Sequence, residues 1–122
     1  MCRLNDSEWQ VLTALWDRPE GAELGQVAEA LRPETGWSRN TVLTYLTRME
    51  KKGLVSIDKS AYPHRYRAAA DRDACTARER RRLLDRVYRG SAGDLVAAFL
   101  KEEPLPPEAR ERLKALLDEM EV

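Results

Sequence analysis

The segment from Ser38 to Gly53 places the strongest constraint on how this chain can fold. Apolar side chains recur in it at the spacing of one helix face, at Val42, Tyr45, Leu46 and Met49. Ser38 is suited to cap the first turn, because a short side-chain oxygen accepts hydrogen bonds from unpaired amides. Gly53 follows two lysines, a combination typical of the end of a helix. The sequence therefore predicts a short amphipathic helix with one buried face.

The opposite face of this expected helix is polar and cationic. At about 100° per residue, that face carries Asn40, Thr44, Thr47 and Lys51, flanked by Leu43 and Arg48, with Arg39 in the first turn. Such a surface fits the major groove of DNA, where asparagine pairs with adenine, arginine with guanine, and a threonine or leucine methyl group with thymine. An ordinary solvated helix shows the same pattern, so the neighbouring segments must decide.

The neighbouring segments favour a winged helix-turn-helix. Two short helices are expected before residue 38, and a β-hairpin is expected after Gly53. The expected ranges are 6–16 and 22–31 for the helices, with 54–57 and 64–67 for the strands. Asp6 or Ser7 is expected to cap the first helix. In this fold the second helix of the helix-turn-helix pair reads bases, which assigns that role to the segment that begins at Ser38.

The last third of the chain is expected to be helical. Its periodic segments cover residues 71–89, 92–103 and 107–120. We therefore expect a mainly α chain with a small antiparallel β-hairpin: a winged helix-turn-helix DNA-binding domain at residues 1–70, followed by a three-helix dimerisation domain at residues 71–122.

The net charge of zero hides an uneven distribution. Residues 37–67 hold seven basic and two acidic residues, whereas residues 90–122 hold four basic and eight acidic residues. The hairpin would carry Lys59, His64, Arg65 and Arg67 toward phosphates or the minor groove. Phosphate contacts of this kind set affinity and register, and base contacts set sequence specificity.

Composition excludes several other classes of protein. The apolar share of 43% argues against a disordered tail, and no run approaches the roughly 20 apolar residues of a membrane span. The N-terminal residues lack the apolar run of a signal peptide. Cys2, Cys75 and His64 are too widely spaced for a metal motif. We expect a cytoplasmic protein with no enzyme activity, no metal and no cofactor.

Several stretches together resemble one family. They are residues 8–11, 15–16, 40–53, 64–66, 84–91, 95–99 and 113–117, which occur in order along nearly the whole chain. The chain resembles the penicillinase-repressor and methicillin-resistance-repressor family of bacterial winged-helix regulators, which also includes copper-responsive repressors. The resemblance implies a transcriptional repressor that binds a palindromic double-stranded DNA operator as a homodimer.

The resemblance also bears on individual residues. Thr41, Thr44 and Arg48 fall on recognition-helix positions of the family, and Leu43 stands where several members have a basic residue. The expected DNA-contacting residues are Ser38, Arg39, Asn40, Thr41, Leu43, Thr44, Thr47, Arg48, Lys51, Lys59, His64, Arg65 and Arg67.

The tail is expected to form the dimer. Its apolar candidates for the interface are Leu95, Val96, Phe99, Leu100, Leu113, Leu116, Leu117 and Met120. Burying each such side chain is worth roughly 1.5–3 kcal/mol, and a twofold partner would supply the missing surface. A monomer whose tail folds back on the first domain is the alternative.

Regulation is expected to differ from that of some family members. In antibiotic-responsive members a membrane sensor or protease system leads to cleavage of an Asn-Phe bond, and the matching position here reads Ala98-Phe99. The tail after Cys75 lacks the paired cysteines of the copper-responsive members.

The alternative function is a winged-helix adaptor that binds a protein without recognising an operator.

Overall fold

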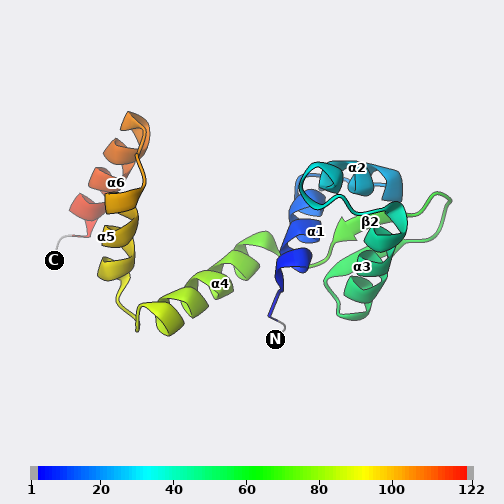
Figure 1. Cartoon of the computed structure of the whole chain (residues 1–122), viewed down its shortest axis with the longest axis horizontal. Coiled ribbons are helices and arrows are strands. Elements are labelled where there is room, and N and C mark those ends of the chain that lie inside the picture. The colour runs from blue at the N-terminus through cyan, green and yellow to red at the C-terminus, as the bar shows by residue number, and fades with distance from the viewer. Residues whose placement is uncertain (1–2, 121–122) are drawn as a thin grey trace. The chain divides into compact units, whose positions relative to one another are not determined.

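The fold begins with three helices and a β-hairpin, followed by three more helices (Figure 1). The structure is a computed structural model, and it describes residues 3–120. Over these residues the elements are α1 Asp6–Trp16, α2 Leu24–Thr35, α3 Arg39–Lys51, β1 Val55–Asp58, β2 Arg65–Ala68, α4 Arg72–Val87, α5 Ala92–Glu102 and α6 Pro107–Glu119. The predicted fold class, mainly α with a small antiparallel hairpin, is confirmed.

The chain forms two compact units, residues 1–76 and 77–122. The first unit contains α1, α2, α3, the hairpin and the first residues of α4. The division at residue 70 into a DNA-binding and a dimerisation domain is functional, and it stays a prediction.

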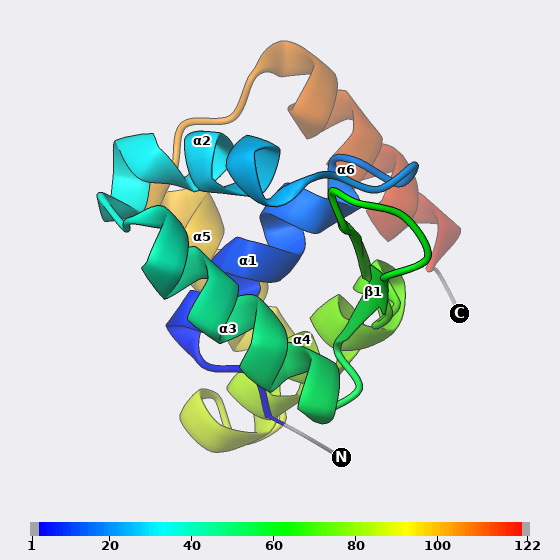
Figure 2. The ribbon, with the colours of Figure 1, turned by 90° about the vertical axis from the view of Figure 1, so that its right-hand side faces the viewer.

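The core of the first unit lies among α1, α2, α3 and the hairpin (Figure 2). The predicted inner face of α3 is confirmed, since Val42, Leu46 and Met49 are at most 1% exposed. Tyr45 lies at the edge of this face, with its ring centroid 4.6 Å from that of Trp37. These contacts fix which side of α3 points away from the core.

The cap of α1 differs from the prediction. Asn5 is the capping residue, in place of Asp6 or Ser7. Its Oδ1 accepts a hydrogen bond from the Glu8 amide at 2.8 Å, and Glu8 Oε1 accepts one from the Asn5 amide at 3.0 Å. This reciprocal capping box satisfies two amides, and the Glu8 carboxylate three residues after Asn5 supplies its second half.

The start of α2 also differs from the prediction. Ala22 was expected to be helical, but it pairs with Tyr66 in β2. The Ala22 amide donates to the Tyr66 carbonyl at 3.0 Å, and the Tyr66 amide donates to the Ala22 carbonyl at 2.8 Å. The segment before α2 therefore adds a short third edge to the hairpin. At its other end α2 continues to Thr35 and is capped by Gly36, whose φ of 66° suits glycine.

The hairpin pairs β1 and β2 in antiparallel register. Ile57 lies opposite Tyr66, and Val55 lies opposite Ala68. Val55 and Tyr66 are buried, whereas Ser56, Arg65 and Arg67 are exposed. The hairpin therefore has one face on the core and one polar face.

The second unit contains little buried surface. No residue of α5 or α6 is buried within the chain. Among the described residues, no helix combines the length and the apolar character that crossing a membrane requires.

Candidate nucleic-acid interface

The side of α3 that faces away from the core carries the predicted DNA-contacting residues. Among them Ser38, Arg39, Asn40, Leu43, Thr44, Thr47, Arg48 and Lys51 are exposed, and Thr41 is half-buried. Because the opposite face is anchored by the core, these side chains form one continuous surface on a rigid helix. The surface combines hydrogen-bonding side chains with methyl groups and cations, as base recognition requires.

The first turn of α3 uses part of its polar groups internally. Ser38 Oγ accepts from the Thr41 amide at 3.2 Å and lies 3.1 Å from Thr41 Oγ1. Thr44 Oγ1 donates to the Asn40 carbonyl at 2.9 Å. The Thr44 hydroxyl therefore keeps acceptor capacity, and its methyl group suits contact with a thymine methyl.

A cleft lies between the start of α2, the start of α3 and the hairpin. The residues that line it are Glu23, Leu24, Gly25, Gln26, Arg39, Leu43, Tyr62, Pro63, His64 and Tyr66. Arg39 and Leu43 from α3 thus share one concavity with His64 from the hairpin loop. This arrangement places α3 and the hairpin around a common space.

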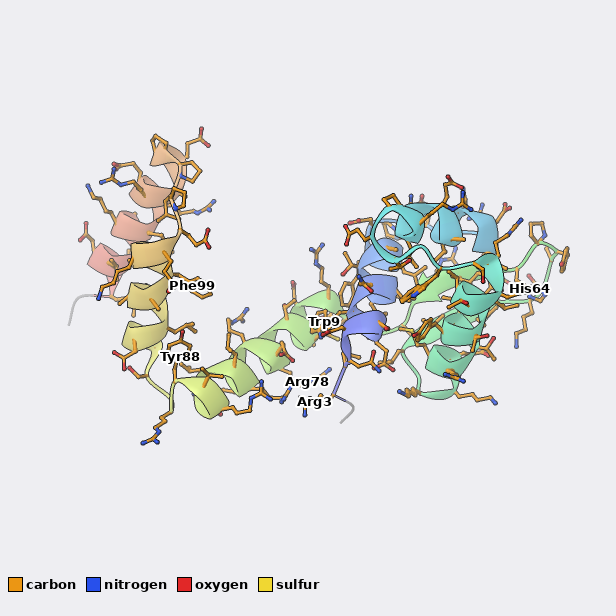
Figure 3. The ribbon with its side chains drawn as sticks, viewed as in Figure 1. Arg3, Trp9, His64, Arg78, Tyr88 and Phe99 are labelled. Atoms are coloured by element: carbon orange, nitrogen blue, oxygen red, sulfur yellow. The ribbon has the colours of Figure 1, made fainter. Side chains whose placement is uncertain are left out.

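The hairpin loop, or wing, projects an aromatic side chain that the sequence reading did not select. The Tyr62 side chain is 89% exposed. Its ring stands edge-on to the His64 ring, and the two ring centroids are 5.3 Å apart. His64, labelled in Figure 3, is half-buried. An aromatic residue inside the predicted turn, between Ala61 and Pro63, was the available signal for Tyr62.

Lys59 and Asp58 lie at the start of the wing. The Lys59 ammonium is 3.5 Å from Glu50 Oε2 in an exposed pair, which contributes little to stability and leaves the cation accessible. Asp58 Oδ1 accepts hydrogen bonds from the Ser60 hydroxyl at 2.6 Å and the Ser60 amide at 3.0 Å. Both hydrogen bonds lower the pKa of the Asp58 carboxyl, and the bond from the Ser60 hydroxyl has the larger effect. The turn therefore holds a negative charge beside the cationic wing at neutral pH.

Arg65 and Arg67 bind the backbone between α1 and α2. Arg65 Nη1 donates to the Gly21 carbonyl at 3.0 Å, and Arg67 Nη2 donates to the Glu20 carbonyl at 2.8 Å. The sequence reading assigned both side chains to DNA alone and missed these long-range contacts. Each guanidinium has five N–H groups, and the backbone contact uses one of them. Donors therefore remain for a phosphate, and that contact stays a prediction.

A lysine at the end of α3 ties this helix to α1. The Lys52 ammonium lies 2.6 Å from Glu8 Oε2, and the Glu8 side chain is only 4% exposed. Glu8 thus serves both the capping box and an ion pair. The pair fixes the C-terminal end of the helix that carries the candidate DNA surface.

The predicted dimer residues of the second unit are accessible within the single chain. Val96, Phe99, Leu100, Leu116, Leu117 and Met120 are between 46% and 72% exposed, whereas Leu95 and Leu113 are half-buried. Figure 3 shows the Phe99 side chain projecting from α5. The Ala98-Phe99 peptide bond lies inside α5, so its helical backbone would have to open before a protease could cut it.

Two of the three residues considered as metal ligands lie in different elements of the described chain. Cys75 is buried in α4, His64 lies in the wing, and Cys2 lies outside the described residues. Over residues 3–120, no three histidine, cysteine or carboxylate side chains gather as a metal site.

Comparison with known proteins identifies the family. The family model described as penicillinase repressor matches residues 4–119. The chain belongs to this family. The match extends over both units, so the tail is part of the shared architecture.

Two relatives from this family match the present chain over nearly its full length. The methicillin resistance regulatory protein MecI of Staphylococcus aureus is 24% identical over 115 residues, covering 94% of this chain and 93% of MecI. The penicillinase repressor of Bacillus licheniformis is 26% identical over 117 residues, covering 96% of this chain and 91% of that protein.

One solved structure resembles more than half of the present chain. It is the solution structure of monomeric Bacillus licheniformis BlaI in complex with the blaP half-operator. The TM-score is 0.51 at 25% identity, covering 59% of this chain and 87% of that chain. The related fold is thus known in a DNA-bound form.

Proposed function

We propose that this protein is a sequence-specific transcriptional repressor that binds a palindromic operator as a homodimer. The exposed polar and cationic face of α3, on a fold related to operator-bound BlaI, carries this proposal. A family of transcriptional repressors calls for no catalytic centre. The site of action is the DNA, so we place the protein in the cytoplasm.

The residues of α3 divide into two roles. Those expected to contact base edges are Asn40, Leu43, Thr44, Thr47 and Arg48, and those expected to contact the DNA backbone are Ser38, Arg39, Thr41 and Lys51. The first group lies on the exposed face of α3, with Asn40 in the first turn and its other members beyond the turn that Ser38 caps. Major-groove patterns distinguish all four base pairs, so this group would supply the sequence specificity.

The wing adds backbone contacts. Lys59 offers an exposed ammonium, and His64 lies in the cleft that α3 borders. Arg65 and Arg67 would contribute the guanidinium donors that the α1–α2 turn leaves over. These contacts strengthen binding to every sequence alike and make it sensitive to salt.

Dimerisation follows from the exposed apolar faces of α5 and α6. Six large apolar side chains between residues 92 and 120 lie in contact with solvent in the single chain, an arrangement that favours burial against a second copy. Two linked recognition helices would read two half-sites and raise the effective local concentration of each. The palindromic operator reflects this twofold symmetry.

Inactivation by a membrane sensor or protease system would act on this interface. Cleavage of the Ala98-Phe99 bond would separate most of α5 from Phe99, Leu100 and all of α6. The intact dimer contacts would then be lost. Immunoblots of induced cells would show a fragment ending at Ala98 if this route operates, and only full-length protein if it does not.

The test is a gel shift with DNA from upstream of the protein's own gene. Binding should weaken steeply as salt rises, because each neutralised phosphate releases counterions. Absence of a shift with every upstream fragment, or a shift insensitive to salt, would contradict the proposal.

Charge reversal separates the repressor from the adaptor alternative. The double variant Arg48→Glu with Lys51→Glu should lose the shift, because both side chains lie on the exposed face of α3. Its dimer, measured by sedimentation, should stay intact because the tail is unchanged. Wild-type DNA binding by this variant would contradict DNA contact through α3, whereas absence of DNA binding by the wild-type chain itself would favour the adaptor.

A further inference from the structure

We propose that Gly25 is a positioning residue for Arg39. The absence of a side chain at Gly25 lets the Arg39 guanidinium lie against the first turn of α2, where it meets one phosphate of the operator. This inference rests on the proposed DNA-binding function. It names a residue on the neighbouring helix that sets the place of a cation on the recognition helix.

The geometry between the two residues is tight. Gly25 is the second residue of α2, and a Cβ atom there would lie 3.0 Å from Arg39 Nη2 and 3.6 Å from Arg39 Cζ. Such a Cβ would displace the guanidinium, which is the mobile end of a long side chain. The fold itself would not have to shift, so the consequence of a side chain at Gly25 falls on Arg39.

The backbone of Gly25 does not require glycine. The positive-φ glycines among the described residues are Gly21, Gly36, Gly53 and Gly90, and Gly25 is not one of them. Glycine inside a helix lowers stability relative to alanine. The space that the guanidinium occupies accounts for a glycine that the helix conformation alone does not explain.

The location of Arg39 points to an anion outside the chain. Arg39 is the first residue of α3, and its exposed cation stands at the positive end of the helix dipole, where a cation is unfavourable. The first turns of α2 and α3 have no acidic residue, whereas those of α1, α4, α5 and α6 each have at least one. A DNA phosphate would be stabilised by both the helix end and the guanidinium.

The surrounding cleft fits this ligand. Gly25 and Arg39 line it together with Leu43 and His64. A backbone phosphate held by Arg39 would thus lie beside a side chain that faces the bases and beside the wing. Gly25 would in this way set the register of the helix on the DNA.

The experiment compares two glycine-to-alanine variants of the full chain in operator binding. Gly25→Ala is the test, and Gly93→Ala is the matched control, because Gly93 is also the second residue of its helix and a Cβ there meets nothing within 4 Å. Both are also measured for thermal unfolding. The probe is the upstream DNA fragment that wild type shifts.

We expect Gly25→Ala to bind about tenfold more weakly for each half-site, the loss of roughly one charge-assisted contact per protomer. Its melting temperature should equal or exceed that of wild type, because alanine favours the helix. Gly93→Ala should bind as wild type. In an Arg39→Ala background, Gly25→Ala should have no further effect. That background loses one phosphate contact in each half-site, so its slope of log affinity against log salt should be shallower by about 1.8 for the dimer.

Two results with Gly25→Ala would overturn the inference while leaving the proposed function standing. One is wild-type binding by Gly25→Ala, and the other is an equal loss with and without Arg39. Wild-type affinity and salt slope for Arg39→Ala would also overturn it, since no contact would then need positioning. Loss of DNA binding by the wild-type chain under all conditions would instead contradict the proposed function itself.

Discussion

The ion pair between Glu8 and Lys52 gives a stability prediction that can be worked from the structure. Lys52→Met keeps most of the side-chain bulk and removes the charge that faces the Glu8 carboxylate at 2.6 Å. The Glu8 side chain is 4% exposed and that of Lys52 is 47% exposed. The variant therefore leaves a buried carboxylate without its cation.

The expected loss of stability is intermediate between buried and exposed pairs. Removing one member of a fully buried pair costs about 3–5 kcal/mol, whereas exposed pairs are worth about 0–1 kcal/mol. Because solvent reaches the lysine side of this pair, we expect Lys52→Met to cost about 1–2 kcal/mol. For a unit of this size that corresponds to a melting temperature lower by about 4–16 °C.

Thermal unfolding followed by circular dichroism measures this effect. Lys51→Met is the matched control, because it removes an exposed charge one residue away on α3 and should leave the melting temperature within about 2 °C of wild type. In a double-mutant cycle, Glu8→Gln should recover part of the loss caused by Lys52→Met, because the buried charge is then absent. Equal melting temperatures for the two lysine variants would refute the reasoning.

Three further predictions concern the DNA surface, the tail and the wing. Arg48→Ala should weaken operator binding by about 1–3 kcal/mol and relax specificity at one base pair, as gel shifts with single-base operator variants would show; a uniform loss on all sequences would contradict a base contact. Phe99→Asp should sediment as a monomer, because it places a charge among apolar side chains, and an unchanged dimer would count against the tail interface. The pKa of Asp58 should lie below its usual range because Ser60 donates two hydrogen bonds to it, so the turn's stabilisation should be present at neutral pH and lost as pH falls through that lowered pKa. Carboxyl NMR titration measures this, and Ser60→Ala should move the pKa back upward.

Local patterns were sufficient to predict α3. Its apolar spacing, the Ser38 cap and the stop at Gly53 are all properties of adjacent residues, and each is found in the structure. The outward direction of Arg48 follows from the same spacing. The exposed half of the candidate site could therefore be predicted before the fold was known.

Pairings between distant residues could not be predicted in the same way. Ala22 continues the apolar pattern of α2, yet its backbone pairs with Tyr66. Arg67 reads as a free cation in the wing, yet it donates to the Glu20 carbonyl. These contacts depend on where the hairpin packs, which the local periodicity of either segment does not specify.

The contact between Gly25 and Arg39 could not be predicted from the sequence either. Gly25 occupies an ordinary helical position, and only the folded structure shows that the Arg39 guanidinium lies where its side chain would begin. The second unit gives the opposite case. The exposure of Phe99 and Leu117 follows from the sequence, because two short helices cannot bury their own apolar faces.

The most direct test of the account is the number of chains bound to one operator. Sedimentation of wild-type protein on the upstream fragment that it shifts would give the mass of the complex. The account predicts two chains per palindromic duplex, with steep salt dependence. One chain per duplex at undiminished affinity, or no complex at any salt concentration, would contradict it.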